Sequence, residues 1–216
     1  MHSYASDSID RRIAPWVIAV CAVGVAFLYG VLSHAFHFSL PWWCETPTII
    51  FVYGLFHWVY ASWLWKRKVF GLGLSLIPDC NGTWYGELHS SHDSGTKVEG
   101  ILFVHQTWSK IALEFQTISS VSYSRMVSLN VTPGASEGLI YEYTNDPRAD
   151  ANGTMHAHRG FAFLKLSTDG TWLNGDYYSG RDRATFGTIC LRLVSHKRLD
   201  LKEAKNQYSR TAKGLT

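Results

Sequence analysis

A run of twenty residues without a charged side chain, 13–32, constrains this chain more than any other feature of its sequence. An α-helix rises about 1.5 Å per residue, so a helix of this length spans the roughly 30 Å hydrocarbon core of a bilayer. Residues 47–65 form a second stretch of the same kind. We therefore expect an N-terminal segment, residues 1–72, that holds two transmembrane helices, at about 13–32 and 47–65.

Basic residues stand at the outer ends of both stretches and are missing between them. Arg11 and Arg12 precede the first stretch and a Lys-Arg-Lys run, 66–68, follows the second, whereas residues 33–45 contain no Lys or Arg. Cytoplasmic flanks carry an excess of these residues, so both termini and the domain after the helices are expected in the cytoplasm. A cleaved signal peptide ending near 33–35 is the alternative interpretation of the first stretch, and it would leave that domain in the cytoplasm.

The rest of the chain predicts an all-β fold. Segments rich in β-branched and aromatic residues alternate with clusters of Gly, Ser, Asn and Asp, and short connections such as 167–170 indicate sequential hairpins. Because no helical stretch separates them, we expect an eight-stranded antiparallel meander β-barrel over residues 80–195. The expected strands are 82–89, 98–107, 110–117, 121–131, 137–144, 156–167, 171–179 and 185–194.

A basic tail follows this barrel. Residues 196–216 contain six Lys and Arg side chains and two acidic ones. Such a segment either lies along an anionic membrane leaflet or remains solvated.

Strand alternation predicts that Arg125 lies inside the barrel. Successive side chains point to opposite faces of a strand, and Arg125 shares its face with Val127 and Leu129. A buried cation without a counter-charge loses several kcal/mol of solvation, so it needs an anionic partner. That partner is either a carboxylate of the chain, such as Glu99 or Asp176, or an anionic ligand at the barrel mouth.

The same alternation assigns other inward positions. On the strand of Arg125 it turns Tyr123 inward and Ser122 outward. In neighbouring strands the residues expected to face inward are Ile111, Leu113, Phe115, Leu139, Tyr141, Tyr143, Gly187, Ile189, Leu191 and Leu193.

The densest group of candidate ligand-binding residues precedes the last expected strand. Arg181 and Arg183 lie two residues apart on a loop, directly after Tyr177 and Tyr178. Guanidinium groups offer fork-shaped donors for phosphate, and aromatic rings stack on bases, so this combination favours a phosphorylated nucleotide. The alternative is a solvated loop in which Asp182 pairs with the arginines.

Tryptophan and tyrosine side chains elsewhere allow two interpretations. Trp84, Tyr85 and Trp172 are either ring platforms for a ligand or side chains that plug the barrel.

Other patterns exclude several classes of protein. The net charge of +3 is too small for a protein that tracks the phosphates of a DNA or RNA duplex. The four cysteines show no CxxC spacing, which argues against a zinc site or a disulfide framework. His156 and His158 share a strand face but lack a third ligand, so neither a metal nor another cofactor is expected. No catalytic motif such as GxSxG or HExxH occurs, and the chain is therefore not expected to be an enzyme.

Two membrane helices, a basic stop and a β-only domain that opens with NGTWYGE and closes with GDYYSGRDRATFGTICLRL resemble one known family. The chain is similar to the two-transmembrane, β-strand-rich effectors of bacterial anti-phage systems that signal through cyclic oligonucleotides, known as CBASS. The resemblance implies that the barrel binds a cyclic dinucleotide made by a partner nucleotidyltransferase. It also implies self-association of the helices, disruption of the inner membrane and abortive infection.

The resemblance and the physical interpretation together give a set of candidate contacts. A membrane-tethered barrel for a lipid or other apolar ligand and a membrane-anchored hydrolase remain alternatives. The candidate ligand-binding residues are Arg125, Tyr141, Tyr143, Trp172, Tyr178, Arg181 and Arg183.

Overall fold

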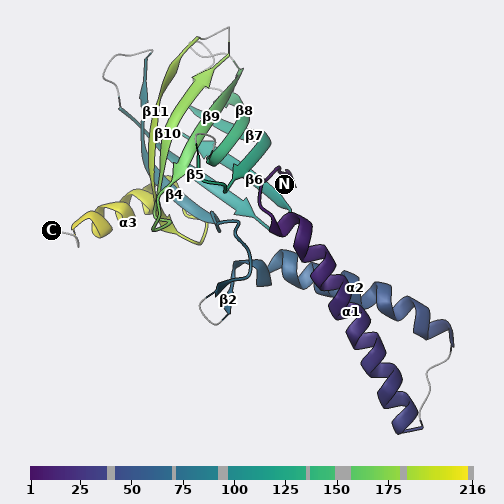
Figure 1. The fold of residues 1–216 in the computed structure, drawn as a ribbon. Coiled ribbons are helices and arrows are strands. Elements are labelled where there is room, and N and C mark those ends of the chain that lie inside the picture. The colour runs from purple at the N-terminus through teal and green to yellow at the C-terminus, as the bar shows by residue number, and fades with distance from the viewer. Residues whose placement is uncertain are drawn as a thin grey trace. The chain divides into compact units, whose positions relative to one another are not determined.

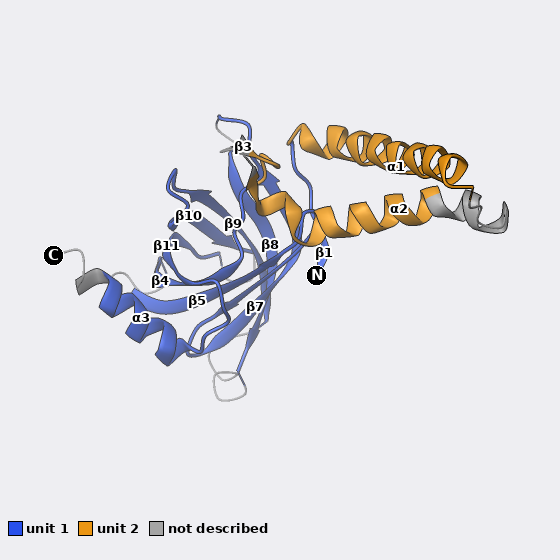
Figure 2. Ribbon diagram, turned by 90° about the horizontal axis from the view of Figure 1, so that it is seen from below, with its two compact units in different colours: residues 1–7, 78–216 blue, residues 8–77 orange. Residues whose placement is uncertain are grey.

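The chain forms two compact units, a β-barrel and a helical unit. The computed structural model describes residues 1–37, 42–69, 72–91, 97–134, 137–148, 157–180 and 184–213. Residues 1–7 and 78–216 belong to the barrel unit, and residues 8–77 form the helical unit (Figures 1 and 2). Residues 1–7, which precede the first long helix, therefore belong to the same unit as the chain from Pro78 onward.

All eight expected strands are confirmed, with bounds that differ by at most three residues. They are β4 (Gly82–Ser90), β5 (Lys97–Gln106), β6 (Lys110–Gln116), β7 (Ser120–Asn130), β8 (Gly138–Pro147), β9 (His158–Leu166), β10 (Trp172–Ser179) and β11 (Phe186–Ser195).

The eight strands close into an antiparallel barrel. Each strand pairs with the next along the chain, β11 pairs with β4, and β6 pairs with β7. The β6–β7 contact holds only three residue pairs, from Glu114–Tyr123 to Gln116–Val121. Farther along, the strand β1 (His2–Ser3) pairs with β6, and Ala5 bridges to Ser128 of β7. The first residues of the chain therefore complete the seam of the barrel, which sequence patterns did not indicate.

The expected facing of β7 is wrong at the start of the strand. A β-bulge lies between Ser124 and Met126, so one extra residue shifts the alternation. Ser122 is buried and Tyr123 is 48% exposed, whereas Leu129, beyond the bulge, is buried as expected. Arg125 lies in the bulge and is exposed, not inside the barrel.

Aliphatic side chains fill one end of the barrel. The expected inward positions of β6, β8 and the middle of β11 are confirmed by their burial. Trp84 lies among them, and its ring Nε1 donates to the carbonyl oxygen of Cys80 at 3.0 Å. Its indole is fully buried, so it plugs the barrel as one of the two interpretations held. The fully buried side chains on the inner faces are Trp84, Leu102, Ile111, Leu129, Leu139, Leu164, Leu173 and Leu191.

One buried glutamine holds both chain segments that lead to the helical unit. Gln106 Oε1 accepts a hydrogen bond from the backbone N–H of Cys80 at 2.8 Å. Its Nε2 donates to the carbonyl oxygen of Pro78 at 3.1 Å and to the hydroxyl of Tyr4 at 3.3 Å. Tyr4 also donates to the carbonyl oxygen of Trp108 at 3.1 Å. Both segments are thus fixed at the end of β5, on the end of the barrel filled by Trp84.

The C-terminal segment contains a helix that the sequence patterns did not indicate. Its described part forms the helix α3 (Leu201–Lys213), whose apolar side packs on the outer face of β4 and β5. Ala204 is fully buried there, and the ring centroid of Tyr208 lies 5.3 Å from that of Tyr85.

The helical unit contains two helices, whose described apolar parts differ in length. The helix α1 (Asp10–Ala35) is long and apolar enough to cross a membrane. The helix α2 (Trp42–Ser62) has 21 residues, and its part Ile49–Ser62 is a shorter apolar stretch. A short helix, η1 (Leu64–Lys66), and the strands β2 (Lys68–Val69) and β3 (Leu72–Gly73) follow.

Candidate functional site

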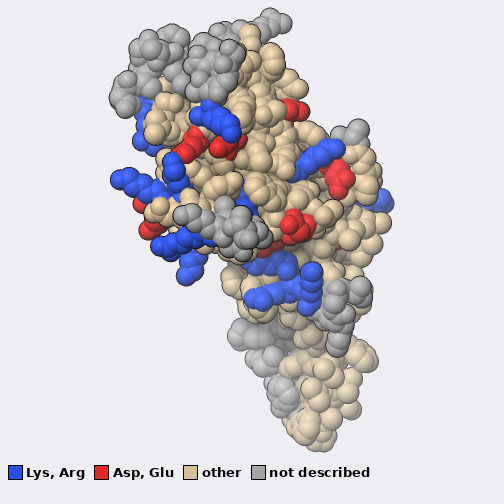
Figure 3. All heavy atoms as spheres, turned by 90° about the vertical axis from the view of Figure 1, so that its left-hand side faces the viewer, with Lys and Arg blue, Asp and Glu red and all other residues tan. Residues whose placement is uncertain are grey.

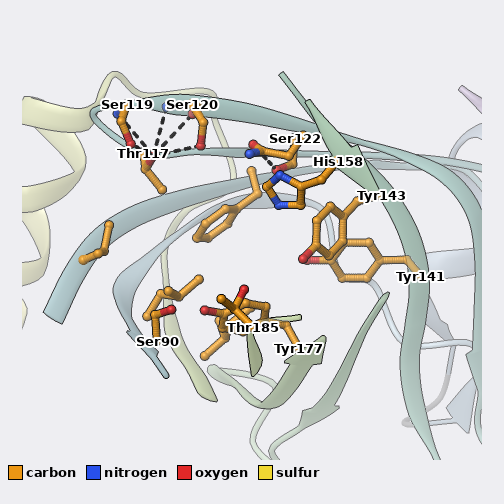
Figure 4. A pocket seen from close by; sticks show the side chains of 15 residues that line it. Ser90, Thr117, Ser119, Ser120, Ser122, Tyr141, Tyr143, His158, Tyr177 and Thr185 are labelled. Atoms are coloured by element: carbon orange, nitrogen blue, oxygen red, sulfur yellow. Dashed lines mark hydrogen bonds between the residues drawn. The ribbon is translucent and has the colours of Figure 1, made fainter. Parts of the chain in front are cut away.

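A cavity of about 140 Å³ lies inside the barrel at the end opposite to Trp84. It is bounded by the last residues of β4, β6, β8 and β10 and by the first residues of β5, β7, β9 and β11 (Figure 4). The lining residues are Leu88, Ser90, Val98, Phe115, Thr117, Ser119, Ser120, Ser122, Tyr141, Tyr143, Asn145, His158, Tyr177, Thr185 and Ile189. We call this the open end, and the end filled by Trp84 the closed end.

The turn between β6 and β7 brings three hydroxyl groups to the cavity. Thr117 Oγ1 accepts hydrogen bonds from the backbone N–H groups of Ser119 and Ser120, at 3.3 and 3.1 Å. It also lies 3.2 Å from the hydroxyl of Ser120. These local bonds hold a tight turn, so the hydroxyl groups are fixed in position before a ligand arrives.

A buried polar pair lies beside this turn. Ser122 donates to Asn145 Oδ1 at 3.0 Å, and both residues are buried. The bulge in β7 is the reason that Ser122 faces the cavity. Since a hydroxyl and an amide can both donate and accept, the pair suits the polar edge of a nucleobase or a ribose hydroxyl.

Aromatic rings of the cavity wall pack closely against glycines of neighbouring strands. Gly160 faces Tyr143 across the β8–β9 pair, and a Cβ atom there would collide with the Tyr143 ring. Gly187 and Tyr177 show the same relation across β10 and β11. Glycine within a strand often marks a close approach of this kind. The space that the rings leave free becomes the cavity.

Tyr141 and Tyr143 form one side of the cavity, together with His158 (Figure 4). The two tyrosine rings are tilted by 52° with centroids 6.1 Å apart, and the ring of His158 meets Tyr143 edge-on. Burial, and then the neighbouring Tyr143, raises the pKa of Tyr141 above its ordinary value. Tyr141 therefore keeps its proton at neutral pH and offers a neutral surface.

The structure brings two of the seven candidate residues to the cavity and places three outside it. Tyr141 and Tyr143 line the cavity. Arg125 is exposed at the β7 bulge, and Tyr178, 57% exposed, lies on the outer face of β10. Trp172 is also outside, with the guanidinium of Arg192 5.5 Å from its ring centroid. The prediction that Arg125 lies inside the barrel is wrong. The assignment of Tyr178 and Trp172 as ligand contacts did not depend on an inward position, and it stays a prediction.

Neither carboxylate suggested for Arg125 pairs with it in the described part of the chain. Glu99 is bonded to Lys205, at 2.6 and 2.8 Å, and Asp176 lies on the outer face of β10. The expectation of a buried Arg125 ion pair is therefore wrong, because the arginine is not buried.

Arg181 and Arg183 lie outside the described residues, as does His156. The two arginines belong to the connection between β10 and β11. The residues that flank this connection in the cavity wall are Tyr177 and Thr185. His158 lines the cavity, and within the described residues no group of three or more possible metal ligands occurs.

Sequence reasoning missed most of the cavity. It did not single out Thr117, Ser119, Ser120, Ser122 or Asn145. One signal was available: glycines 100, 160 and 187 interrupt otherwise strong strands, and each packs against an aromatic ring of the cavity wall. The polar turn residues could not be located without the barrel closure that brings both turns and strand ends together.

Comparisons with known proteins agree with this architecture. Residues 75–193 match the family model described as "Cap15, cyclic dinucleotide receptor domain". The chain is also 32% identical, over 145 residues, to "CD-NTase-associated protein 15" from Yersinia aleksiciae, an alignment that covers 66% of this chain and 67% of that protein. The matched family is a receptor family, not a catalytic one. Together with the eight-stranded barrel and its cavity, these matches show that the chain belongs to the Cap15 family of cyclic dinucleotide receptors, effectors of CBASS anti-phage signalling.

Proposed function

We propose that the cavity at the open end holds part of a cyclic dinucleotide, and that its binding makes the membrane-anchored chains assemble and disrupt the inner membrane. One observation carries this proposal: the open end of the barrel is lined by polar groups, whereas its closed end is filled. Hydroxyl and amide groups line the open end, whereas the closed end carries the segments that lead to the helical unit. A ligand from the cytosol therefore reaches the cavity from the side away from these attachments.

The size of the cavity supports partial insertion. Sites that enclose a drug-sized ligand usually have about 300–1,000 Å³, and this cavity has about 140 Å³. Among the described lining residues none is a lysine or an arginine. We propose that one base and its ribose enter, and that the two phosphates remain at the mouth. There Arg181 and Arg183 would bind them as fork-shaped donors.

The residues that make up the barrel unit support a membrane hairpin with both ends in the cytoplasm. Residues 1–7 and the chain from Pro78 onward fold as one unit, so they lie on the same side of any membrane. If α1 crosses, α2 must return, and its 21 residues reach about 31 Å. Arg11, Arg12 and the basic run 66–68 favour the cytoplasm for that side.

Binding of the ligand must favour the assembled state if it is to drive assembly. A ligand shifts an equilibrium only by its difference in affinity for the two states. We propose that the source of the ligand is a nucleotidyltransferase, consistent with the name "CD-NTase-associated protein 15" of the Yersinia relative. Assembly of the anchored helices would then disrupt the membrane and cause abortive infection.

Calorimetry on the full chain in detergent micelles tests ligand binding. We expect one or more cyclic dinucleotides from a panel of purine and pyrimidine forms to bind, and the linear dinucleotides of the same bases to bind at least tenfold more weakly. Binding of fatty acids with no binding of any cyclic dinucleotide would contradict the proposal and favour a barrel for apolar ligands. Breakdown of the ligand during the titration would favour a hydrolase.

The variant Arg181→Ala separates the two parts of the proposed site. A hydrogen bond to a charged group contributes about 1.5–3 kcal/mol, so the affinity should fall by about ten- to a hundredfold. Arg125→Ala is the matched control, because Arg125 is exposed outside the cavity. We expect the affinity of this variant for the cyclic dinucleotide to be unchanged.

Dye release from liposomes that contain the full chain, with and without the bound cyclic dinucleotide, tests membrane disruption. No ligand-dependent release would contradict that part of the proposal.

A further inference from the structure

A second hollow lies on the outer surface of the barrel, at the open end. It has a volume of about 240 Å³ and is bounded by the last residues of β4 and β10 and by the first residues of β11. We call it the outer hollow. Ser90, at the end of β4, lines both the outer hollow and the cavity inside the barrel. The two spaces therefore lie on either side of the same stretch of rim.

Farther from the rim, the chain covers the outer face of β4 and β5 with its own helix. Tyr85, Ile101 and Phe103 are buried beneath α3 and the segment before it. Glu99 on this face is paired with Lys205 at 2.6 Å. Figure 3 shows the α3 side of the molecule, where basic side chains lie beside acidic ones. This wall is thus occupied by α3, whereas the outer hollow beside it is open.

Two aromatic rings line the outer hollow near the rim. Tyr178 pairs with Phe186 across β10 and β11, and both residues line the hollow. They are 57% and 60% exposed, respectively. Exposed aromatic rings are the surfaces on which nucleobases stack, whatever the identity of the base.

Polar groups line the outer hollow farther from the rim. Asp176 and Thr188 pair across β10 and β11, two residues away from Tyr178 and Phe186 toward the closed end. Both are exposed, and within the described residues Asp176 is not part of an ion pair. A carboxylate accepts hydrogen bonds and a hydroxyl both donates and accepts them, so this pair can bind the polar edge of a base.

Basic residues stand at the rim itself. Arg181 and Arg183 belong to the connection between β10 and β11. Arg159 lies beside the start of this connection, because its carbonyl oxygen accepts a hydrogen bond from the backbone N–H of Gly180 at 2.6 Å. Its side chain is exposed. The rim next to the outer hollow therefore offers guanidinium groups for phosphate.

The other basic residues of this outer face lie away from the hollow. Lys165 is opposite Asn174 and Arg192 is opposite Trp172, nearer to the closed end. Lys165 Nζ lies 5.9 Å from the ring centroid of Phe163, and the guanidinium of Arg192 lies 5.5 Å from that of Trp172. From the rim toward the closed end, the wall thus presents guanidinium groups, then two rings, then an acid and a hydroxyl.

We infer that the outer hollow binds the second nucleobase of the cyclic dinucleotide, so that the ligand lies across the rim with one base inside the barrel and the other outside. The order of groups along the wall matches the phosphate, the face and the polar edge of a nucleotide. The inference rests on the proposed function, and it adds a site for the half of the ligand that the cavity does not admit.

The sizes of the two spaces support one base in each. The cavity has about 140 Å³ and the outer hollow about 240 Å³. Neither reaches the about 300–1,000 Å³ of a site that encloses a drug-sized ligand, whereas the two together do. A ligand with two bases joined through phosphates therefore needs both spaces.

Calorimetry on the full chain in detergent micelles tests the inference, with the cyclic dinucleotide that the wild-type chain binds. We expect Tyr178→Ser combined with Phe186→Ser to lower the affinity at least tenfold, because both stacking surfaces are lost. Phe161→Ser is the matched control and should leave the affinity within twofold. It removes a 57% exposed ring from the same outer face that does not line the hollow.

The same titration distinguishes two kinds of failure. If the wild-type chain binds no cyclic dinucleotide, the proposed function fails and the inference fails with it. If the wild-type chain binds and the Tyr178/Phe186 double variant binds equally well, only the inference is overturned.

A photoreactive ligand locates the second base without any substitution. A cyclic dinucleotide with an azido group on both bases is bound to the wild-type chain, irradiated, and its crosslinked peptides are mapped by mass spectrometry. We expect crosslinks on both sides of the rim, to Tyr141 or Tyr143 in the cavity and to Tyr178 or Phe186 in the outer hollow. Crosslinks confined to the cavity residues would overturn the inference.

Discussion

The closed and open ends of the barrel are built from the same eight strands, yet they have different tasks. At the closed end, Trp84 and large aliphatic side chains fill the interior, and Gln106 satisfies the backbone groups of the attached segments. At the open end, aromatic rings lie against glycines and hydroxyl groups surround a cavity. The difference teaches that stability and recognition are separated along the barrel axis, so substitutions at the two ends should have separable effects.

Trp84→Ala should produce the largest loss of stability. Truncating a fully buried aromatic side chain usually costs about 3–5 kcal/mol, because a cavity remains. Urea unfolding of the full chain in detergent, followed by circular dichroism, measures the change. Trp172→Ala is the control, since this ring lies on the outer face and is only partly buried; we expect a loss near 1 kcal/mol. Equal losses for the two variants would contradict a packed closed end.

Gln106→Ala should produce the next largest loss of stability. It leaves the backbone N–H of Cys80 and the carbonyl group of Pro78 without their partner. An unsatisfied buried group costs about 1–3 kcal/mol. The same unfolding experiment applies, with Gln207→Ala on the exposed side of α3 as the control. A loss no larger than that of the control would show that these contacts do not hold the attached segments.

At the open end, Asn145→Ala should lower the affinity for the ligand more than the stability of the fold. We expect a loss of stability of about 1 kcal/mol, because one hydrogen bond with Ser122 disappears. The affinity for the bound cyclic dinucleotide should fall at least tenfold by calorimetry. Asn174→Ala, exposed on the outer face of β10, serves as the control. If Asn145→Ala lowered stability as much as Trp84→Ala and left affinity intact, the separation of the two ends would be wrong.

The smallest expected effect is a pH dependence that originates near the closed end. Burial, and then the neighbouring Asp79, raises the pKa of the Cys80 thiol to about 12. The unfolded thiol ionises near pH 8.5, so this group stabilises the fold fully below that pH and loses its contribution as the pH rises toward 12. The expected loss at pH 9 is below about 1 kcal/mol. Urea midpoints between pH 8 and 10 measure it.

Cys80→Ala should remove this component of the pH dependence. The native Cys80 thiol should also react with iodoacetamide more slowly than the exposed Cys190. Rapid alkylation of Cys80 in the folded chain would contradict a sealed closed end.

The sequence allowed the strands to be predicted because period-two patterns depend on neighbours in the chain. The eight strands followed from segments rich in β-branched and aromatic residues between turn residues, and the inward positions of β6 and β8 followed from alternation. Arg125 did not, because the bulge after Ser124 inserts one residue and turns the preceding side chains to the other face. Tyr178 was among the candidate ligand contacts and Tyr177 was not, yet of the two only Tyr177 lines the cavity.

The chain's amino-acid order by itself determined that a charge-free helical stretch precedes a meander of eight strands, since helix length, charge-free runs and strand alternation are local properties. Only the tertiary structure decided that residues 1–7 complete the barrel seam, that α3 covers one wall, and that Ser122 and Asn145 meet at the open end. These features join residues far apart in the chain, and their positions depend on the closure of the barrel and on a single bulge. The physical reason is that a one-residue shift in register exchanges the inner and outer faces of a strand, and no local pattern records such a shift.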